Sequence, residues 1–306
     1  MIVTGWIDEQ VLKPKGISII IPTTRIHLLS RLLKSVHADK TLINHEILLV
    51  GNYQLIGAID KLKKEFPCIR FVKQNEKNVS LSRNIGINRS KFEMVSLIDD
   101  DDLWLNDRTK AFVENLNFEK DTIIFGSCFF VNKDKKTSRV MSNSGFIKTN
   151  DFRNQFIAPI YKRQKYFLQV GNCAFFKSEK IPNFREKLSY LEDQIWVFEA
   201  LLAGVSVKQF KDITLCYSFS RKRSVERWSL CNEIALHQFL ESFEAGLGDK
   251  YVKKSSLKSV AISGNKKAFS LAKKSINSHF KLGYYSELSQ LVLYIVNRLS
   301  YLLKFD

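Results

Sequence analysis

The chain has 306 residues, of which 45% are hydrophobic and 26% are charged, and these proportions exclude general disorder and low complexity. Its 13 glycines and 5 prolines exclude a collagen-like or linker-rich chain. Lysine and arginine (48) outnumber aspartate and glutamate (31), and the formal charge of +17 predicts a polyanionic partner. Composition alone leaves open whether this partner is nucleic acid, an anionic membrane or a phosphorylated small molecule.

The first hundred residues alternate between apolar runs and segments whose apolar residues recur at helical spacing. Buried strands are predicted at residues 16–22, 45–50, 69–73 and 94–98. Helices are predicted at residues 25–36, 55–66 and 80–90. This alternation predicts an α/β fold with a doubly wound, mostly parallel sheet, in which the ligand site lies beyond the carboxyl ends of the strands.

The second half of the chain is less regular. Further strands are predicted at residues 122–131, 170–176 and 205–219, the last as a strand or a hairpin. A polar loop or hairpin is predicted at residues 132–145, and a helix at residues 191–203. From about residue 225 the chain is helical in pattern and rich in lysine. We therefore place a domain boundary near residue 220.

Targeting and metal motifs are missing from the sequence as read. The N-terminal residues include Asp8 and Glu9 and contain no apolar core of a signal peptide. No stretch reaches the roughly 18 apolar residues of a membrane-spanning helix. The five cysteines include no CxxC pair, and the five histidines show no HExxH or other ligand spacing. We expect a cytoplasmic protein with reduced thiols, and we interpret the histidines as structural or surface residues.

Four successive aspartates, Asp99 to Asp102, directly follow the fourth predicted strand. Adjacent carboxylates repel one another, so such a run is costly unless a cation is present. In extended backbone Asp99 and Asp101 point the same way, and Asp102 reaches in from the following turn. Carboxylates of this kind suit Mg²⁺ or Mn²⁺ bridged to substrate phosphates. The alternative is a solvated acidic turn in which Asp102 or a neighbour caps the next helix.

A second carboxylate pair, Glu192 and Asp193, opens the helix predicted at residues 191–203. One interpretation is that these side chains only complement the helix dipole. The other is that one of them is a general base that takes a proton from a bound hydroxyl.

Four segments follow one another in the chain: ISIIIPTTR (17–25), NVSLSRNIGINRS (78–90), VSLIDDDDLW (95–104) and LEDQIWVFEALLAG (191–204). In this order they resemble family 2 glycosyltransferases of the bacterial cell-surface polysaccharide type. The resemblance covers about residues 16–220. It implies an inverting enzyme, with a GT-A catalytic domain at 1–220 whose sheet is flanked by helices, and a basic, mostly helical C-terminal extension at 221–306.

The resemblance also implies roles on the donor side. Asp99 and Asp101 match the DxD positions, with Asp102 adjoining, and would hold Mn²⁺ or Mg²⁺ on the diphosphate. Asp99 and Asp100 would contact the donor itself. The remaining donor-binding residues that the resemblance implies are Arg83, Asn84, Pro22 and Thr23.

On the acceptor side, Asp193 matches the catalytic base of the family, and Glu192 would orient this base or bind the acceptor. Two positions depart from the family pattern. Thr24 stands where an aromatic residue usually holds the nucleobase, and Gly51 stands where the second strand usually ends in aspartate. The neighbouring Asn52 offers an amide to the base, and Tyr53 offers a replacement stacking surface. A UDP-sugar is the expected donor.

The positive charge is densest at the C-terminal end: residues 207–306 hold 17 of the 48 lysines and arginines but 8 of the 31 acidic residues. Residues 288–305 are strongly apolar at helical spacing, with polar interruptions. One interpretation is a helix in the interface of an anionic membrane, which suits a lipid-linked acceptor. The other is a helix packed on the catalytic domain.

The function implied is metal-dependent, inverting transfer of a hexose from a nucleotide-sugar donor to a glycan or lipid-linked acceptor, in polysaccharide biosynthesis. The alternatives are a sugar-nucleotide nucleotidyltransferase and a catalytically inactive basic protein that binds nucleotides or nucleic acid. The first should carry a glycine-rich loop after the first strand, which IPTTRIHLL lacks. The acidic cluster argues against nucleic acid, so we expect a cytoplasmic enzyme, with peripheral contact with the inner face of the membrane left open.

Overall fold

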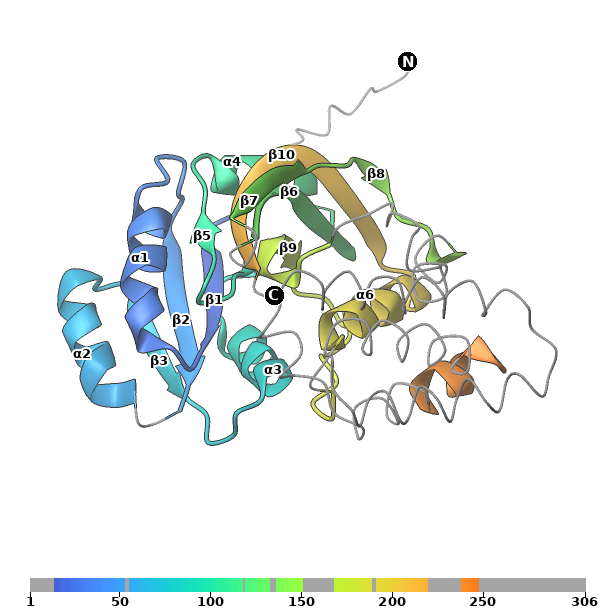
Figure 1. Ribbon diagram of the computed structural model, residues 1–306, viewed down its shortest axis with the longest axis horizontal. Helices are drawn as coiled ribbons and strands as arrows, with labels where there is room; N and C mark the ends of the chain where they lie inside the picture. Colours follow the sequence, from blue (N-terminus) through green and yellow to red (C-terminus); the bar gives the residue numbers. More distant parts are fainter. Residues whose placement is uncertain are drawn as a thin grey trace, which may run out of the picture.

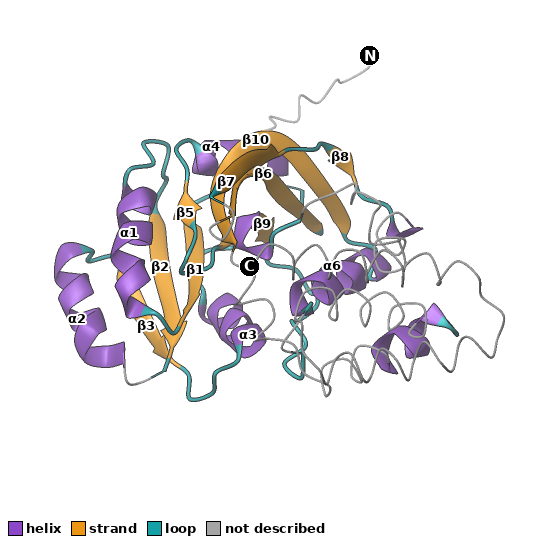
Figure 2. Ribbon diagram, viewed as in Figure 1, coloured by secondary structure: helices purple, strands orange, loops and turns teal. Residues whose placement is uncertain are grey.

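The structure is a computed structural model that describes residues 14–52, 55–117, 119–132, 136–150, 168–188, 191–219 and 238–247. In this part of the chain, ten strands form one sheet with helices against both faces (Figures 1 and 2). Its strand order is β3-β2-β1-β4-β9-β6-β10-β5, with β7 beside β6 and β8 beside β10. The predicted extension at 221–306, its apolar segment at 288–305, and Tyr53 lie outside the described residues, apart from the segment 238–247.

The first half of the sheet follows the prediction closely. Its parallel strands are β1 (Ile17–Thr23), β2 (His45–Gly51), β3 (Ile69–Lys73) and β4 (Met94–Leu97). The helices between them are α1 (Ile26–His37), α2 (Ile56–Glu65) and α3 (Val79–Arg89). Each of the first three strands is followed by a helix that returns the chain to the opposite end of the sheet, which is why these four strands run in one direction.

The second half of the sheet is mixed. Its strands are β5 (Leu103–Trp104), β6 (Thr122–Asn132), β7 (Thr137–Met141), β8 (Gly145–Phe146), β9 (Cys173–Phe176) and β10 (Ser206–Phe219). Strand β9 runs antiparallel to both β4 and β6, so the parallel pairing continues only between β6 and β10. Within the segment 132–145, strand β7 pairs antiparallel with β6, and β10 is one long strand with irregular register between Gln209 and Leu215.

Two apolar layers enclose the sheet, and β1 shows how one strand serves both. Ile17, Ile19 and Ile21 face the layer that holds α1, α2 and α4 (Arg108–Leu116), whereas Ile20 faces the layer that holds α3 and α6 (Glu192–Leu202). Alternate side chains of a strand point to opposite faces, so a continuous run of isoleucine is what a doubly covered strand requires. Among the described residues, no helix is long and apolar enough to cross a membrane.

Helix α3 lies close against β1 because of Gly86. A Cβ at this position would collide with the Ile20 side chain. The helix begins at a capped end, where the Asn78 side chain accepts a hydrogen bond from the Leu81 N–H at 3.0 Å. The close approach and the cap together place Arg83 at the carboxyl ends of the parallel strands.

Candidate active site

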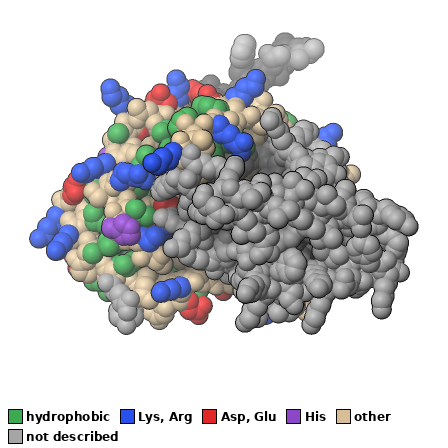
Figure 3. Space-filling model, in the orientation of Figure 1, with side chains coloured by type: hydrophobic (Ala, Val, Ile, Leu, Met, Phe, Trp, Pro, Cys, Tyr) green, Lys and Arg blue, Asp and Glu red, His purple; other side chains and the backbone are tan. Residues whose placement is uncertain are grey.

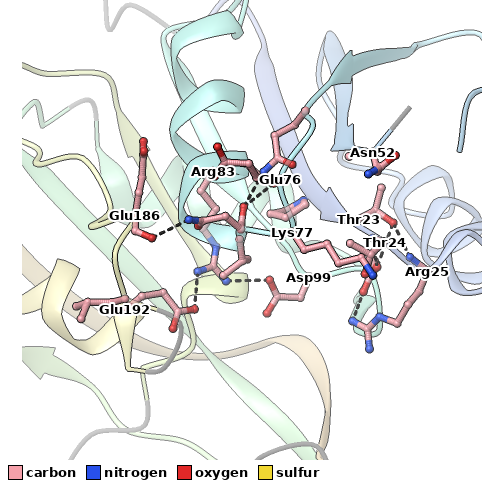
Figure 4. Close-up of a pocket in the computed structure, with 18 of the residues that line it drawn as sticks. Thr23, Thr24, Arg25, Asn52, Glu76, Lys77, Arg83, Asp99, Glu186 and Glu192 are labelled. Carbon is pink, nitrogen blue, oxygen red and sulfur yellow. Dashed lines mark hydrogen bonds and ion pairs between the residues drawn. The ribbon is translucent and has the colours of Figure 1, made fainter. Parts of the chain in front are cut away.

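A cavity of about 370 Å³ lies at the carboxyl ends of β1, β2 and β4. Its lining includes these predicted site residues: Pro22, Thr23, Asn52, Arg83, Asp99, Asp100, Asp101 and Glu192. Figure 4 shows Arg83 and Glu192 on one side of the close-up, and Thr23, Thr24, Arg25 and Asn52 on the other. The motifs that are separated along the chain therefore meet at the sheet edge where a ligand was expected.

Arg83 connects the two acidic groups of the site. Its guanidinium donates to Asp99 Oδ1 at 3.0 Å and to Glu192 Oε1 at 3.2 Å (Figure 4). Burial of Arg83 would lower its pKa, but the charges of Asp99 and Glu192 raise it, so the residue stays a cation. A buried, doubly paired guanidinium holds the strand end after β4 and the start of α6 in a fixed relation.

Asp100 and Asp101 both form ion pairs with the guanidinium of Arg25. Arg25 bridges the two carboxylates, and it lies 3.0 Å from Asp101 Oδ1. Asp100 Oδ2 also accepts hydrogen bonds from the Thr23 hydroxyl at 3.0 Å and the Thr24 N–H at 3.3 Å. Burial raises the pKa of Asp100, and Arg25 opposes that rise. Sequence reasoning gave Arg25 no role, although it closes the segment ISIIIPTTR.

Asp102 lies behind the cavity and is fully buried. Its Oδ1 accepts from the Ser218 N–H of β10 at 3.2 Å, whereas Oδ2 has no hydrogen-bond partner among the described residues. Burial and the charges of Asp99 and Asp101 raise its pKa well above the ordinary value. Among the described residues, the oxygens of Asp99, Asp101 and Asp102 do not form a group within 4.8 Å of one another, so a divalent-cation site at the acidic turn stays a prediction.

The helix-capping alternative for the four aspartates is wrong. The next helix, α4, begins at Arg108, and the Thr109 N–H in its first turn donates to Asp39 at 3.1 Å. Helix α4 was not predicted from the sequence. Its buried Arg108 stacks on Trp104, with the guanidinium carbon 4.2 Å from the ring centroid, and donates to the Gly171 carbonyl oxygen at 3.1 Å behind the acidic turn.

Glu192 and Asp193 form the first turn of α6, as predicted. Glu192 lines the cavity and contacts Arg83, whereas Asp193 is not among the lining residues; its Oδ1 accepts from the Gln194 N–H at 2.8 Å. Burial and the neighbouring charge of Glu192 raise the pKa of Asp193 to about 7, against the attraction of Arg83. A carboxyl group that titrates near neutral pH is suited to accept and release a proton.

Asn84 lies next to Arg83, but its side chain bonds to other residues of the protein and is not part of the cavity lining. Its side chain donates to the Phe184 carbonyl at 2.9 Å and to Glu186 Oε1 at 3.1 Å, and it accepts from the Phe184 N–H at 2.8 Å. These three bonds fasten the segment that carries Glu186 to α3. Asn84 therefore positions one wall of the cavity, a role that its place in the SLSRN segment could not reveal.

Tyr217 is a further residue that sequence reasoning missed. Burial raises the pKa of its hydroxyl, and so do the nearby charges of Asp102, Asp99 and Asp193. The residue comes from β10, more than a hundred positions after the acidic turn, so only the pairing of β10 within the sheet brings it here.

Comparisons with known proteins identify the family of the chain and similar folds. The model of the family described as glycosyl transferase family 2 matches residues 18–183. Two uncharacterized glycosyltransferases, of Rickettsia bellii (strain RML369-C) and Rickettsia felis (strain ATCC VR-1525 / URRWXCal2), are 25% and 27% identical over 148 residues, or 47% of this chain. The chain spans only 21% and 24% of the length of these two proteins.

Solved structures of S. aureus TarS residues 1–349 are similar in fold. The complex with UDP-GlcNAc has a TM-score of 0.55 at 14% identity, and the similarity covers 88% of this chain and 93% of that chain. The complex with UDP has a TM-score of 0.52 at 16% identity, over 92% and 79% of the two chains. The predicted GT-A class of α/β fold is thereby confirmed. Since the family model matches more than half of the sequence, the chain belongs to glycosyl transferase family 2.

Proposed function

We propose that this chain transfers a sugar from a nucleotide-sugar donor to an acceptor hydroxyl with inversion at the anomeric carbon. One observation carries the proposal: Arg83 ties Asp99 of the acidic turn to Glu192, the neighbour of Asp193, across one cavity. Membership of the family supports sugar transfer, and the TarS complex with UDP-GlcNAc supports a UDP-sugar as donor.

The donor would occupy the cavity with its nucleotide toward β1 and β2. Its volume of about 370 Å³ lies in the range of small-molecule sites. Thr23 and Asn52 supply hydroxyl and amide groups near the expected base, while Arg25 and Lys77 supply positive charge for phosphates. The side chain of Thr24 is short and exposed, so the chain offers no aromatic stacking at that position.

A divalent cation, Mg²⁺ or Mn²⁺, is part of the proposal. Asp99 and Asp101 would hold it from the cavity side, and Oδ2 of Asp102 would gain the partner that it lacks. When bound, such a cation stabilises negative charge on a leaving diphosphate. Arg25 would then exchange its contact with Asp101 for one with donor phosphate, because a guanidinium pairs equally well with either anion.

Asp193 is proposed as the base. The acceptor oxygen forms a bond to the anomeric carbon while the bond to the diphosphate oxygen breaks, and the hydroxyl proton passes to the Asp193 carboxylate. One displacement inverts the anomeric centre, so no covalent enzyme intermediate is required. Arg83 holds Glu192 beside this base and keeps the catalytic turn in place.

The acceptor is proposed to be a glycan or a lipid-linked saccharide, in keeping with polysaccharide biosynthesis and hexosyl transfer. The lysine-rich C-terminal residues would bring the enzyme to an anionic membrane at its cytoplasmic face. On the face drawn in Figure 3, lysine and arginine side chains are scattered over the described part rather than gathered in one patch. This distribution gives no support to a nucleic-acid partner on that face.

Thermal shift with a panel of nucleoside diphosphates and Mn²⁺ tests the proposal. We expect UDP with Mn²⁺ to raise the melting temperature most, and EDTA to reverse the rise. The Asp101→Ala variant should lose the part of the melting-temperature rise that EDTA reverses, whereas Asp60→Ala, at an exposed position on α2, should keep it. Equal shifts in both variants would overturn the metal site, and an absence of any nucleotide response in the wild-type chain would overturn donor binding.

A further inference from the structure

Three side chains that bind metals readily meet at the amino ends of β2 and β3, away from the cavity. His37 is the last residue of α1, His45 is the first residue of β2, and Cys68 directly precedes β3. Their ligand atoms all lie within 4.8 Å of one another. The acidic turn follows the carboxyl end of β4, which is parallel to β1 and β2, so this trio lies at the opposite edge of the sheet.

The hydrogen bonds of the two histidines leave the correct nitrogens available. His37 Nδ1 lies 2.9 Å from the Leu33 carbonyl oxygen, and His45 Nδ1 lies 3.2 Å from the Ile43 carbonyl oxygen. A carbonyl oxygen only accepts, so Nδ1 of each neutral ring carries the proton and Nε2 carries a lone pair. Metal-binding histidines are held by this type of bond between the second nitrogen and a backbone carbonyl.

The Nε2 atom of His37 faces the Cys68 thiol, and the rings of His37 and His45 lie 5.8 Å apart between their centroids. His37 Nε2 lies 3.5 Å from Cys68 Sγ, which is close to the separation of about 3.6 Å between a nitrogen and a sulfur in tetrahedral zinc sites, given bonds of about 2.0–2.1 and 2.3 Å. His45 Nε2 is buried and has no hydrogen-bond partner among the described residues. Burial also lowers the pKa of His45, which favours the neutral ring that a metal requires.

We propose that His37, His45 and Cys68 form a site for Zn²⁺. Two imidazoles and a thiolate are ligands that select zinc over the hard cations suited to the acidic turn. Burial raises the pKa of the Cys68 thiol, so the metal must displace its proton, and the released proton passes to solvent. His37 is exposed, and water therefore occupies the fourth position.

The site would act as a clip on the outer part of the sheet. It connects the end of α1 to two neighbouring strands, where the Ile47 N–H already donates to the Cys68 carbonyl at 3.2 Å. A ligand that binds only the folded chain raises its free energy of unfolding by an amount that grows with the logarithm of the ligand concentration above the dissociation constant. Bound Zn²⁺ is therefore expected to stabilise the half of the sheet formed by β1, β2 and β3 without taking part in sugar transfer.

Titration of the metal-free full chain with Co²⁺ tests the proposal, because a thiolate ligand to Co²⁺ gives a charge-transfer absorption that carboxylates do not. We expect about one equivalent of Co²⁺ to produce this band, and Zn²⁺ to remove it by displacement. The Cys68→Ser variant should lack the band, and His45→Gln should lower Zn²⁺ affinity at least about 100-fold, since even indirect partners of a metal cost 10–100-fold. Absence of the band in the wild-type chain, or its persistence in Cys68→Ser, would overturn the site.

Matched controls exclude other ligands. His27→Gln changes an exposed histidine on α1, and Cys216→Ser changes a partly buried thiol on β10; both should bind Zn²⁺ as the wild type does. A measurement that needs no variant is alkylation of Cys68 by iodoacetamide, followed by peptide mass spectrometry. We expect Zn²⁺ to slow this reaction at least tenfold, and an unchanged rate would contradict the proposal.

Discussion

Two buried aspartates in neighbouring parts of the molecule have opposite surroundings. Asp39 follows α1 and is 3% exposed, and Asp102 ends the acidic turn and is 1% exposed. The Asp39 carboxylate accepts six hydrogen bonds, from Thr41, Trp104, Asp107 and Thr109. Asp102 accepts one from Ser218, and its other oxygen has no partner among the described residues.

The pKa values of the two carboxyl groups reflect this difference. Burial would raise the pKa of Asp39, but the hydrogen bonds from Thr41 and Trp104 lower it below the ordinary value. For Asp102, burial and the charges of Asp99 and Asp101 raise the pKa instead. A carboxylate whose partners all come from its own chain serves the fold. One that is buried without them is stable as an anion only when a ligand supplies the missing charge.

Asp193 resembles Asp102 in its raised pKa, and its replacement should have the largest effect. Asp193→Asn keeps the shape of the side chain but cannot accept the acceptor's proton, so we expect kcat to fall by about 10²–10⁴-fold. Binding of the donor, measured by thermal shift with UDP and Mn²⁺, should change less than about twofold. Turnover close to the wild-type rate would remove Asp193 as the base.

Asp39 should matter for stability. In Asp39→Asn, an amide NH₂ replaces one oxygen and faces backbone N–H groups that can only donate. Leaving such donors unpaired in the interior costs about 1–3 kcal/mol each, so the free energy of unfolding should fall by about 3 kcal/mol. Urea denaturation measures it, with the exposed Asp60→Asn as the control, expected within about 0.5 kcal/mol of wild type. A loss below about 1 kcal/mol would contradict the structural role of Asp39.

The raised pKa of Asp193 gives a pH dependence of definite sign. The base must be ionised, so kcat/KM should rise as pH increases and level off above a pKa of about 7, with a fall of about tenfold per pH unit below it. The residual activity of Asp193→Asn should lack this rise. A wild-type profile that is flat between about pH 5.5 and 8 would show that no group with this pKa limits the reaction.

The sequence predicted the parts of the fold that depend on local pattern. The isoleucine run predicted a strand where β1 forms, and the helical spacing of leucines predicted a helix where α1 forms. The sequence did not predict α4, because its first turn is capped by Asp39 from about seventy residues away. Nor did it predict the antiparallel direction of β9, which depends on pairing between strands distant in the chain.

The candidate site also contains some residues that the sequence predicted and others that it did not. The acidic turn was predicted because it follows a recognisable strand, and the Glu192–Asp193 pair because it opens a helix, whereas a role for Arg83 was implied only by the resemblance to the family. Arg25 was not predicted, because its contacts with Asp100 and Asp101 arise only when separate elements meet. Local spacing indicates no ligand role for the histidines, yet His37 and His45 converge with Cys68 through the parallel pairing of β2 and β3.

Asp102→Asn should have the smallest effect on stability, which would complete the contrast with Asp39. The raised pKa of Asp102 means that its ionised form is disfavoured in the folded chain, and an amide removes the repulsion from Asp99 and Asp101. The amide oxygen still accepts from the Ser218 N–H. Without divalent cations, the free energy of unfolding should therefore stay within about 1 kcal/mol of wild type, or increase. The rise in melting temperature caused by Mn²⁺ should disappear, and a loss near 3 kcal/mol with the Mn²⁺ response intact would place Asp102 with Asp39 as a residue of the fold.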